Sequence, residues 1–227
     1  MRVDAYPGDV AFFSGRAPIH RRVQRLTGCP WSQVGVIVDL PDWDEPLVLE
    51  ATSFPVCVDV EAGNHATGIR TTRLREKISD FDGAVAMRRL HPRLKSTCVE
   101  RLQAFRRAVL GLPFDFSPSA ARKTLRRSHT TWQPSAFICC SLVAAAYQAL
   151  GILEPPPKGP FANNVLPVDF LGDDLPLLNN HKLGAIRILD TSICLGPTPL
   201  RDQQPFDTGC AEARQTLQQG VSEAGGG

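Results

Sequence analysis

The sequence predicts an α+β fold in which an antiparallel sheet packs against helices. Three observations predict it: runs rich in β-branched residues follow one another in the amino-terminal part of the chain, turn residues separate these runs closely, and helical spacing of apolar residues is confined to segments around them. A doubly wound fold would instead alternate strands and helices. With 43% hydrophobic residues among 227, the chain can bury one substantial core or at most two small ones.

A strand and a helix open the chain. The run "GDVAFF" follows a Pro-Gly turn signal and predicts a short strand. Ile19, Val23 and Leu26 then recur at helical spacing, and Gly28 is typical of a helix end. We therefore expect a strand followed by an amphipathic helix.

Further strands should follow this helix. Three runs rich in β-branched residues are separated by Pro, Asp and Ser, which is typical of an antiparallel meander. They are "QVGVIVDL", "PLVLEAT" and "VCVDV", and "DGAVAMRRL" adds another strand. A second amphipathic helix comes next, because Cys98, Leu102, Phe105 and Val109 share one helical face and Gly111 ends the pattern.

The last predicted elements are a helix and a strand. The run "FICCSLVAAAYQAL" predicts a helix from about Cys140 to Leu150, which Gly151 and the run "PPPKGP" end. The run "KLGAIRILD" predicts a last core strand. We expect one domain over residues 1–193, and a Pro-, Gln- and Gly-rich tail over residues 194–227 that is partly disordered because it lacks apolar periodicity.

The charge of the chain gives little reason to expect a nucleic-acid partner. With 25 basic and 23 acidic residues the formal net charge is +2, which produces no strong long-range field. The basic residues within 122–127 are compatible with a contact to phosphates or an anionic surface, or with a solvated helix face beside a loop. No aromatic residues interleave with these charges, which favours the solvated face.

The lengths of the apolar runs in the sequence bear on the cellular location of the protein. No run reaches the roughly 20 apolar residues that a membrane span requires, so no transmembrane span is expected. The start of the sequence, "MRVDAYPGDVAFF", lacks the apolar core of a signal peptide. We expect a cytoplasmic protein, and export by a secretion system that needs no cleaved signal is the open alternative. The sequence predicts no oligomeric state.

The cysteines are odd in number and scattered, with no CxxC and no Cys/His metal spacing. This pattern predicts free thiols in a reducing compartment, no metal site and no cofactor. The seven are Cys29, Cys57, Cys98, Cys139, Cys140, Cys194 and Cys210.

Two adjacent cysteines stand where the alanine-rich helix begins. A thiol at a helix amino terminus is activated because the helix dipole and unpaired N–H groups favour the thiolate. Cys140 directly precedes "SLV" and is our candidate nucleophile, with Cys139 as its packing neighbour. A buried structural thiol is the alternative, since free cysteines are among the most buried residues.

An ordered set of motifs resembles the circularly permuted branch of the NlpC-type, papain-like cysteine peptidase superfamily, the YiiX-like proteins. The set covers about residues 7 to 153 and comprises "GDVAFF", "CPWSQVGVIVDL", "LVLEATSFPVCVDV", "GLPFDF" and "FICCSLVAAAYQALGI". In that family a Gly-Asp strand and a helix precede a strand headed by Ser-His-Val-Gly, a strand ending in Glu-Ala, and Cys-Ser-x-Leu-Val on a helix. The resemblance implies a permuted papain-like fold, an antiparallel sheet or half-barrel packed against helices.

The resemblance also implies roles for three residues. Cys140 matches the nucleophile, and Glu50 in "VLEAT" matches the acidic residue that orients the base. At the position of the base, where the family has histidine, this chain has Gln33. Glutamine cannot accept and return a proton near neutral pH, so this departure affects activity rather than fold.

None of the five histidines has the family position, and we expect each to be a surface or loop residue. They are His20, His65, His91, His129 and His181. Near the motifs, Asp9 should cap backbone groups of its turn. Trp31 should form either a wall of the cleft or part of the core.

Two functions remain open at this stage. The first is a papain-like thiol hydrolase or acyltransferase that attacks an amide, ester or thioester through an acyl-enzyme intermediate, on a peptide or acyl-group substrate such as a cell-wall peptide or a lipid. The second is a catalytically inactive pseudo-hydrolase that binds a ligand or serves in an assembly, as Gln33 suggests. Nucleic-acid binding through residues 122–127 is a weaker third hypothesis.

Overall fold

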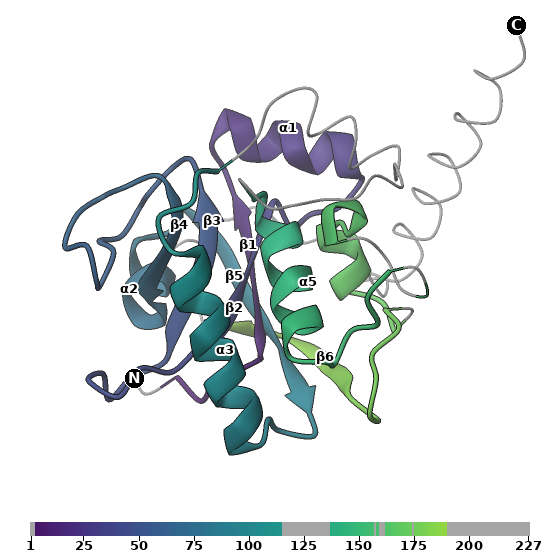
Figure 1. Ribbon diagram of the computed structural model, residues 1–227. Coiled ribbons are helices and arrows are strands. Elements are labelled where there is room, and N and C mark those ends of the chain that lie inside the picture. Colours follow the sequence, from purple (N-terminus) through teal and green to yellow (C-terminus); the bar gives the residue numbers. More distant parts are fainter. Residues whose placement is uncertain (1–2, 115–136, 157, 159–161, 174, 190–227) are drawn as a thin grey trace, which may run out of the picture.

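The computed structural model describes residues 3–114, 137–156, 158, 162–173 and 175–189 (Figure 1). These residues build one open, antiparallel sheet of six strands in the order β4-β3-β2-β1-β5-β6. The strands are β1 (Val10–Gly15), β2 (Gln33–Val38), β3 (Leu47–Thr52), β4 (Gly68–Arg73), β5 (Gly83–His91) and β6 (Lys182–Leu189). The predicted α+β class is confirmed, whereas the half-barrel, the circular permutation and the papain-like fold stay predictions.

Helices cover both faces of the sheet unequally. Helices α3 (Ser96–Val109) and α5 (Cys139–Ala149) lie on one face, together with the short 3₁₀ helices η1 (Ala162–Asn164) and η2 (Pro167–Phe170). The other face carries the short helix α2 (Leu74–Asp80). Helix α1 (Pro18–Thr27) lies across one end of the sheet, near the start of α5 (Figure 1).

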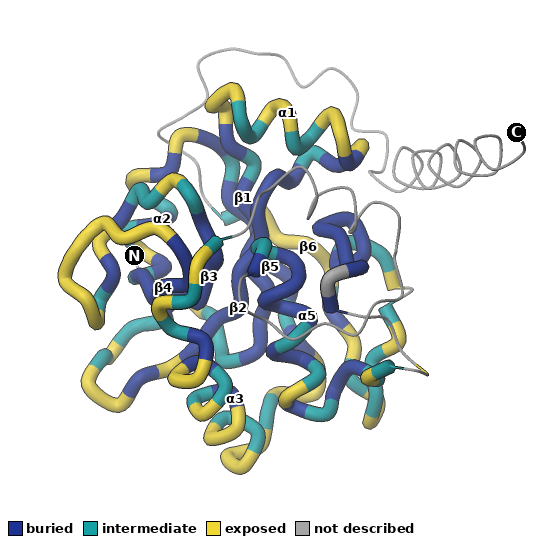
Figure 2. Tube along the Cα trace, turned by 45° about the horizontal axis from the view of Figure 1, so that its top comes forward, coloured by how far each residue is buried: buried dark blue, intermediate teal, exposed yellow. Residues whose placement is uncertain are grey.

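The core has two parts, one on each side of the sheet. The larger part packs alternate side chains of β1, β2 and β3 against the apolar residues of α5, and includes Val34, Val36 and Leu142. The smaller part lies under α2 and includes Phe13, Ile37 and Phe81. Figure 2 shows the result: the central strands and α5 are buried, while α1 and α3 expose their outer sides. Burial on both faces explains why β2 and β3 are continuous apolar runs rather than alternating ones.

The predicted end of the first helix at Gly28 is confirmed by backbone geometry. Helix α1 begins with Pro18, which tolerates the first helical position, and ends at Gly28, whose φ of 61° is left-handed. Helix α5 spans Cys139–Ala149, one residue earlier than expected.

Other predictions are corrected. The run "VCVDV" is not a strand: Asp59 accepts hydrogen bonds from the backbone N–H groups of Glu61 and Ala62 and fixes a turn there. The strand β4 and the helix α2 follow instead. Strand β6 lies at the sheet edge and is largely exposed, so it is not a core strand. The basic segment 122–127 and the tail 194–227 lie outside the described residues, and the predicted domain boundary stays a prediction.

Candidate active site

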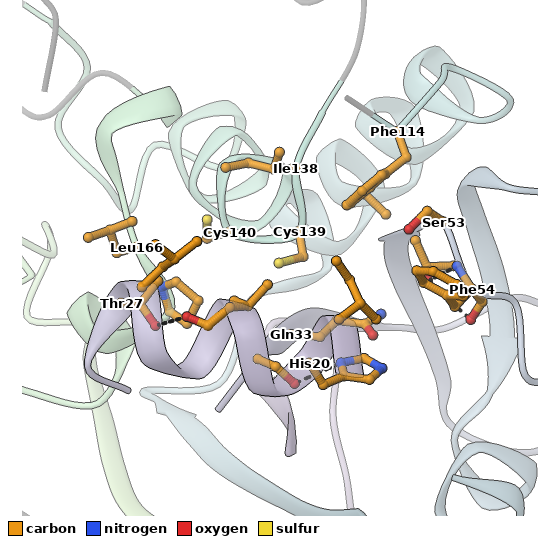
Figure 3. Close-up of a pocket in the computed structure, with 17 residues that line it drawn as sticks. His20, Thr27, Gln33, Ser53, Phe54, Phe114, Ile138, Cys139, Cys140 and Leu166 are labelled. Atoms are coloured by element: carbon orange, nitrogen blue, oxygen red, sulfur yellow. Dashed lines mark hydrogen bonds between the residues drawn. The ribbon is translucent and has the colours of Figure 1, made fainter. Parts of the chain in front are cut away.

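An apolar pocket of about 100 Å³ lies at the end of the sheet where β2 begins and β3 ends. Helix α1 forms one wall, the start of α5 forms another, and the segment before η2 closes a third side (Figure 3). The residues around it are mostly aliphatic or aromatic, which suits an apolar group rather than a charged one. The apolar part of the lining comprises Ile19, Val23, Leu26, Ala51, Phe54, Phe114, Ile138, Leu166 and Pro167.

Both adjacent cysteines line this pocket, but they differ in exposure and direction. Cys139 is the first residue of α5 and is partly exposed, whereas Cys140 is buried, with 2% of its surface accessible. In Figure 3 the sulfur of Cys139 points from the start of α5 towards Gln33 and α1, while that of Cys140 points away on the side of Leu166. Cys139 is therefore the thiol that faces the interior of the pocket beside Gln33.

The two thiols also differ in acidity. The hydrogen bond donated by Cys140 lowers the pKa of Cys139, and the backbone N–H groups of Val34 and Cys140 lower it further, against the effect of burial. That same hydrogen bond and burial raise the pKa of Cys140 well above its ordinary value. Of the pair, Cys139 carries the negative charge more readily. The predicted nucleophilic role of Cys140 stays a prediction.

The sequence itself contains a signal that favours Cys139 over Cys140. The family pattern Cys-Ser-x-Leu-Val has one residue between serine and leucine, but Ser141 directly precedes Leu142 in this chain. Aligning on Leu142 and Val143 instead places Cys139 at the cysteine position and Cys140 at the serine position.

The structure brings Gln33 and Glu50 together, as the resemblance implies. Gln33 begins β2 at the edge of the pocket, and Glu50 lies on the neighbouring strand β3, where it is opposite Gly35. The side-chain amide of Gln33 donates through Nε2 to Glu50 Oε2 at 2.6 Å. Glu50 has no exposed surface, so its carboxylate serves the pocket only through Gln33.

Two cations, which the sequence did not predict, complete the environment of Glu50. Lys77 of α2 donates through Nζ to both carboxylate oxygens, at 3.0 and 2.8 Å. Arg70 of β4 places its Nε 3.6 Å from Glu50 Oε1. All three side chains are buried, Lys77 and Glu50 completely. Burial of charge is tolerated only when it is paired, and here two cations and one amide surround the carboxylate.

His20 also lines the pocket, which corrects its prediction as a surface residue. It lies on α1, is half-buried, and packs edge-on against Phe81 with ring centroids 5.7 Å apart. Its Nδ1 lies 2.9 Å from the hydroxyl oxygen of Ser32. The sequence offers a signal for this position, because His20, Val23 and Thr27 are spaced to lie on one face of a helix.

The other described histidines do not line the pocket. His65 and His91 are exposed, and His181 bonds the carbonyl oxygen of Leu178. His129 lies outside the described residues.

Two residues near the site are structural. Asp9 accepts hydrogen bonds from the backbone N–H groups of Tyr6 and Leu90, which confirms the predicted capping role. Trp31 is a core residue: it is buried and its ring centroid lies 5.9 Å from that of Phe12.

Among the described residues, Cys57, Cys98, Cys139 and Cys140 are free thiols, as predicted. Within the same part of the chain, no group of three or more His, Cys, Asp or Glu side chains could hold a metal ion. Among the helices described, none is long and apolar enough to cross a membrane. Cys194 and Cys210 lie outside the described residues.

Comparison with known proteins finds a similarity of fold to a solved structure. No protein-family model matches the chain, and no curated protein does either. Among solved structures, the crystal structure of the metalloprotein YiiX from Escherichia coli O157:H7, DUF1105, is similar, with 18% sequence identity and a TM-score of 0.50. The similarity covers 83% of this chain and 98% of YiiX. This likeness concerns the fold alone: it is consistent with the YiiX-like resemblance, and the NlpC-type relationship stays a prediction.

Proposed function

We propose that the protein is a thiol-dependent hydrolase or acyltransferase in which Cys139, rather than its neighbour Cys140, is the nucleophile. The observation that carries this proposal is the position of Cys139. It is the first residue of α5, it is partly exposed in the pocket, and its thiol has a lowered pKa. Thiolates at such helix termini are the nucleophiles of many cysteine enzymes.

The surroundings of Cys139 suit acyl transfer. The N–H groups in the first turn of a helix have no acceptor within that helix, and they can stabilise the oxyanion that forms when a thiolate attacks a carbonyl group. The apolar lining of the pocket favours a substrate with an acyl chain or an apolar side chain next to the scissile bond. Amides, esters and thioesters share this chemistry, so a peptide and an acylated lipid are both compatible.

A labelling experiment tests the nucleophile. Brief treatment with iodoacetamide, followed by peptide mass spectrometry, should modify Cys139 faster than the partly exposed Cys98 of α3 by on the order of tenfold. Cys57 should react much more slowly than Cys139, because burial raises the pKa of its thiol to about 11. Equal, slow labelling of Cys139 and Cys98 would contradict the proposal.

An activity assay complements the labelling. Hydrolysis of a short-chain p-nitrophenyl ester should be lost in Cys139→Ala and retained in the control Cys98→Ala, which removes a thiol outside the pocket. Full activity in Cys139→Ala would rule out this residue as the nucleophile.

Gln33 supports the second candidate, a pseudo-hydrolase. The amide of Gln33 donates a hydrogen bond to Glu50, and an amide cannot act as a general base. In that case the pocket would bind an apolar ligand without turning it over. A fluorescent apolar probe that binds the wild type, and binds Val23→Trp much more weakly, would favour this function if Cys139 is also unreactive. The cytoplasmic location, and export as an effector, stay expectations.

A further inference from the structure

His20 packs closely against its neighbours at the wall of the pocket. Its ring packs over Gly15, where a Cβ atom would lie 2.4 Å from His20 Cδ2. Only glycine leaves room for the imidazole there, because any other side chain would displace the ring. With Phe81 on another side of the ring, its position is defined by packing on β1 and on the segment after α2.

The hydrogen bonds around Ser32 define the tautomer of His20. The Ser32 hydroxyl donates to the carbonyl oxygen of Phe13 at 3.1 Å, and it accepts from the N–H of Gly15 at 3.3 Å. A hydroxyl has one proton, so the contact at 2.9 Å requires His20 Nδ1 to be the donor. Nε2 of the neutral ring then carries a free lone pair, and it has no hydrogen-bond partner among the described residues.

The charges around His20 favour this neutral form. Burial lowers the pKa of His20, and the ammonium group of Lys77 on α2 lowers it further. Glu50 on β3 does not offset this effect, because Lys77 and Arg70 already pair with it. The pocket contains no other acidic or basic side chain: Gln33 on β2 is a neutral amide, and the two cysteines at the start of α5 are the remaining titratable groups. On α1 itself, the nearby arginines 21, 22 and 25 are exposed.

We infer that His20 is the general base and acid of the reaction at Cys139, in place of the histidine that Gln33 replaces. The inference rests on the proposed function. His20 and Cys139 line one pocket from opposite walls, α1 and α5, with Gln33 between them in Figure 3. Proton transfer takes place directly or through one water molecule.

The reaction passes through an acyl-enzyme intermediate on Cys139. His20 Nε2 takes the proton of the Cys139 thiol, and the sulfur attacks the carbonyl carbon, so that an S–C bond forms and the C=O π pair moves to oxygen. When the C=O bond reforms, the bond to the leaving group breaks, and the leaving group takes the proton from the imidazolium. A water molecule then attacks the acyl carbon while His20 accepts its proton. The S–C bond breaks, the acid is released, and the proton returns to the sulfur.

The test compares His20→Gln with the control His181→Gln, a histidine that lies outside the pocket. In His20→Gln, kcat for ester hydrolysis should fall by about 10²-fold or more. The midpoint of the pH profile for alkylation of Cys139 should move to higher pH, whereas the rate at high pH, where the thiol is already ionised, should be unchanged. His181→Gln should behave as the wild type.

A rescue experiment tests whether an imidazole at another position beside Cys139 can replace that of His20. The double variant His20→Gln/Gln33→His places an imidazole at position 33, beside Cys139, and should regain much of the lost activity. If His20→Gln is as active as the wild type while Cys139→Ala is inactive, His20 is not the base, and the proposed function survives. If Cys139→Ala is active, the proposed function itself fails.

A measurement on the unmodified protein covers the case in which the variant does not fold. In nitrogen NMR of the wild type, His20 should be protonated at Nδ1 and not at Nε2. Alkylation of Cys139 should shift the titration of His20. The inference would be overturned if Nε2 of the neutral His20 ring carries the proton, or if the titration of His20 does not change when Cys139 is alkylated.

Discussion

Three groups surround Glu50, a carboxylate without exposed surface. Two of them are cations, Lys77 and Arg70, and the third is the amide of Gln33. Lys77 also lies over the rings of Phe13 and Phe81, at 5.1 and 5.6 Å from their centroids. This cluster fixes Gln33 at the pocket, but it contributes geometry rather than proton transfer.

Breaking the buried pair should be costly. Lys77→Met leaves Glu50 with the amide of Gln33 and with Arg70 as a more distant cation. The free energy of unfolding should fall by about 3 kcal/mol, as is usual when a buried ion pair loses one partner. In a double-mutant cycle, Lys77→Met/Glu50→Gln should be less destabilised than the sum of the single changes, by about 1–3 kcal/mol.

Urea unfolding measures these changes. Arg73→Met is the control, because Arg73 pairs with Glu76 at the surface, where both side chains are more than a third exposed. It should cost less than about 1 kcal/mol. A Lys77→Met variant as stable as this control would show that the buried pair contributes nothing.

The site was only partly predictable from the sequence, and the reason is physical. Gln33 and Glu50 stand on adjacent strands, and the resemblance places them at matching positions. Lys77 and Arg70 are charged residues in polar runs, a pattern typical of solvated surfaces, and only the folded sheet shows that they meet a buried carboxylate. His20 was obscured in the same way by the arginines beside it.

At the scale of elements, the strands that were predicted are those whose burial follows from apolar residues. Strand β4, "GIRTTR", was missed because its buried side chains are polar, including Arg70, Thr71 and Thr72. The run "VCVDV" has strong β propensity, but Asp59 captures backbone N–H groups that a strand would need. In the run "VCVDV", side-chain hydrogen bonds thus overrode local propensity.

Arg88 of β5 joins elements that are far apart in the sequence. Its guanidinium donates to the carbonyl oxygens of Phe170, Leu171, Gly172 and Leu183, at 2.9, 2.6, 3.0 and 2.8 Å. These contacts tie β5 to the segment that follows η2 and to the start of β6. Because η2 directly follows a wall of the pocket, Arg88 also supports the site.

Arg88→Lys should therefore be disruptive although it keeps the charge. An ammonium group cannot reproduce the planar fork of donors, so several buried carbonyl groups lose their partner, and the free energy of unfolding should fall by about 3 kcal/mol. Thermal and urea unfolding measure it, with the exposed Arg187→Lys on β6 as the control. Equal stability of the two variants would argue against this role.

For the whole molecule, stability and the candidate function lie in different regions. The central strand β1 is buried along most of its length and pairs with β2 and β5. Helix α1 has a single buried residue, Thr27, and it contributes His20 and one apolar wall to the pocket. A wall with so little burial can open locally without unfolding of the sheet, which would allow an apolar substrate to enter.

Hydrogen exchange followed by mass spectrometry tests this division. Amides of β1 should exchange only through global unfolding, whereas those of α1 should exchange through local opening and therefore much faster. An apolar adduct on Cys139 would pack against Ile19, Val23 and Leu26, so it should slow exchange in α1 and leave α3, which contributes no residue to the pocket lining, unchanged. If α1 is as protected as β1 before modification, the helix is part of the stable core, and the pocket must admit its substrate by another route.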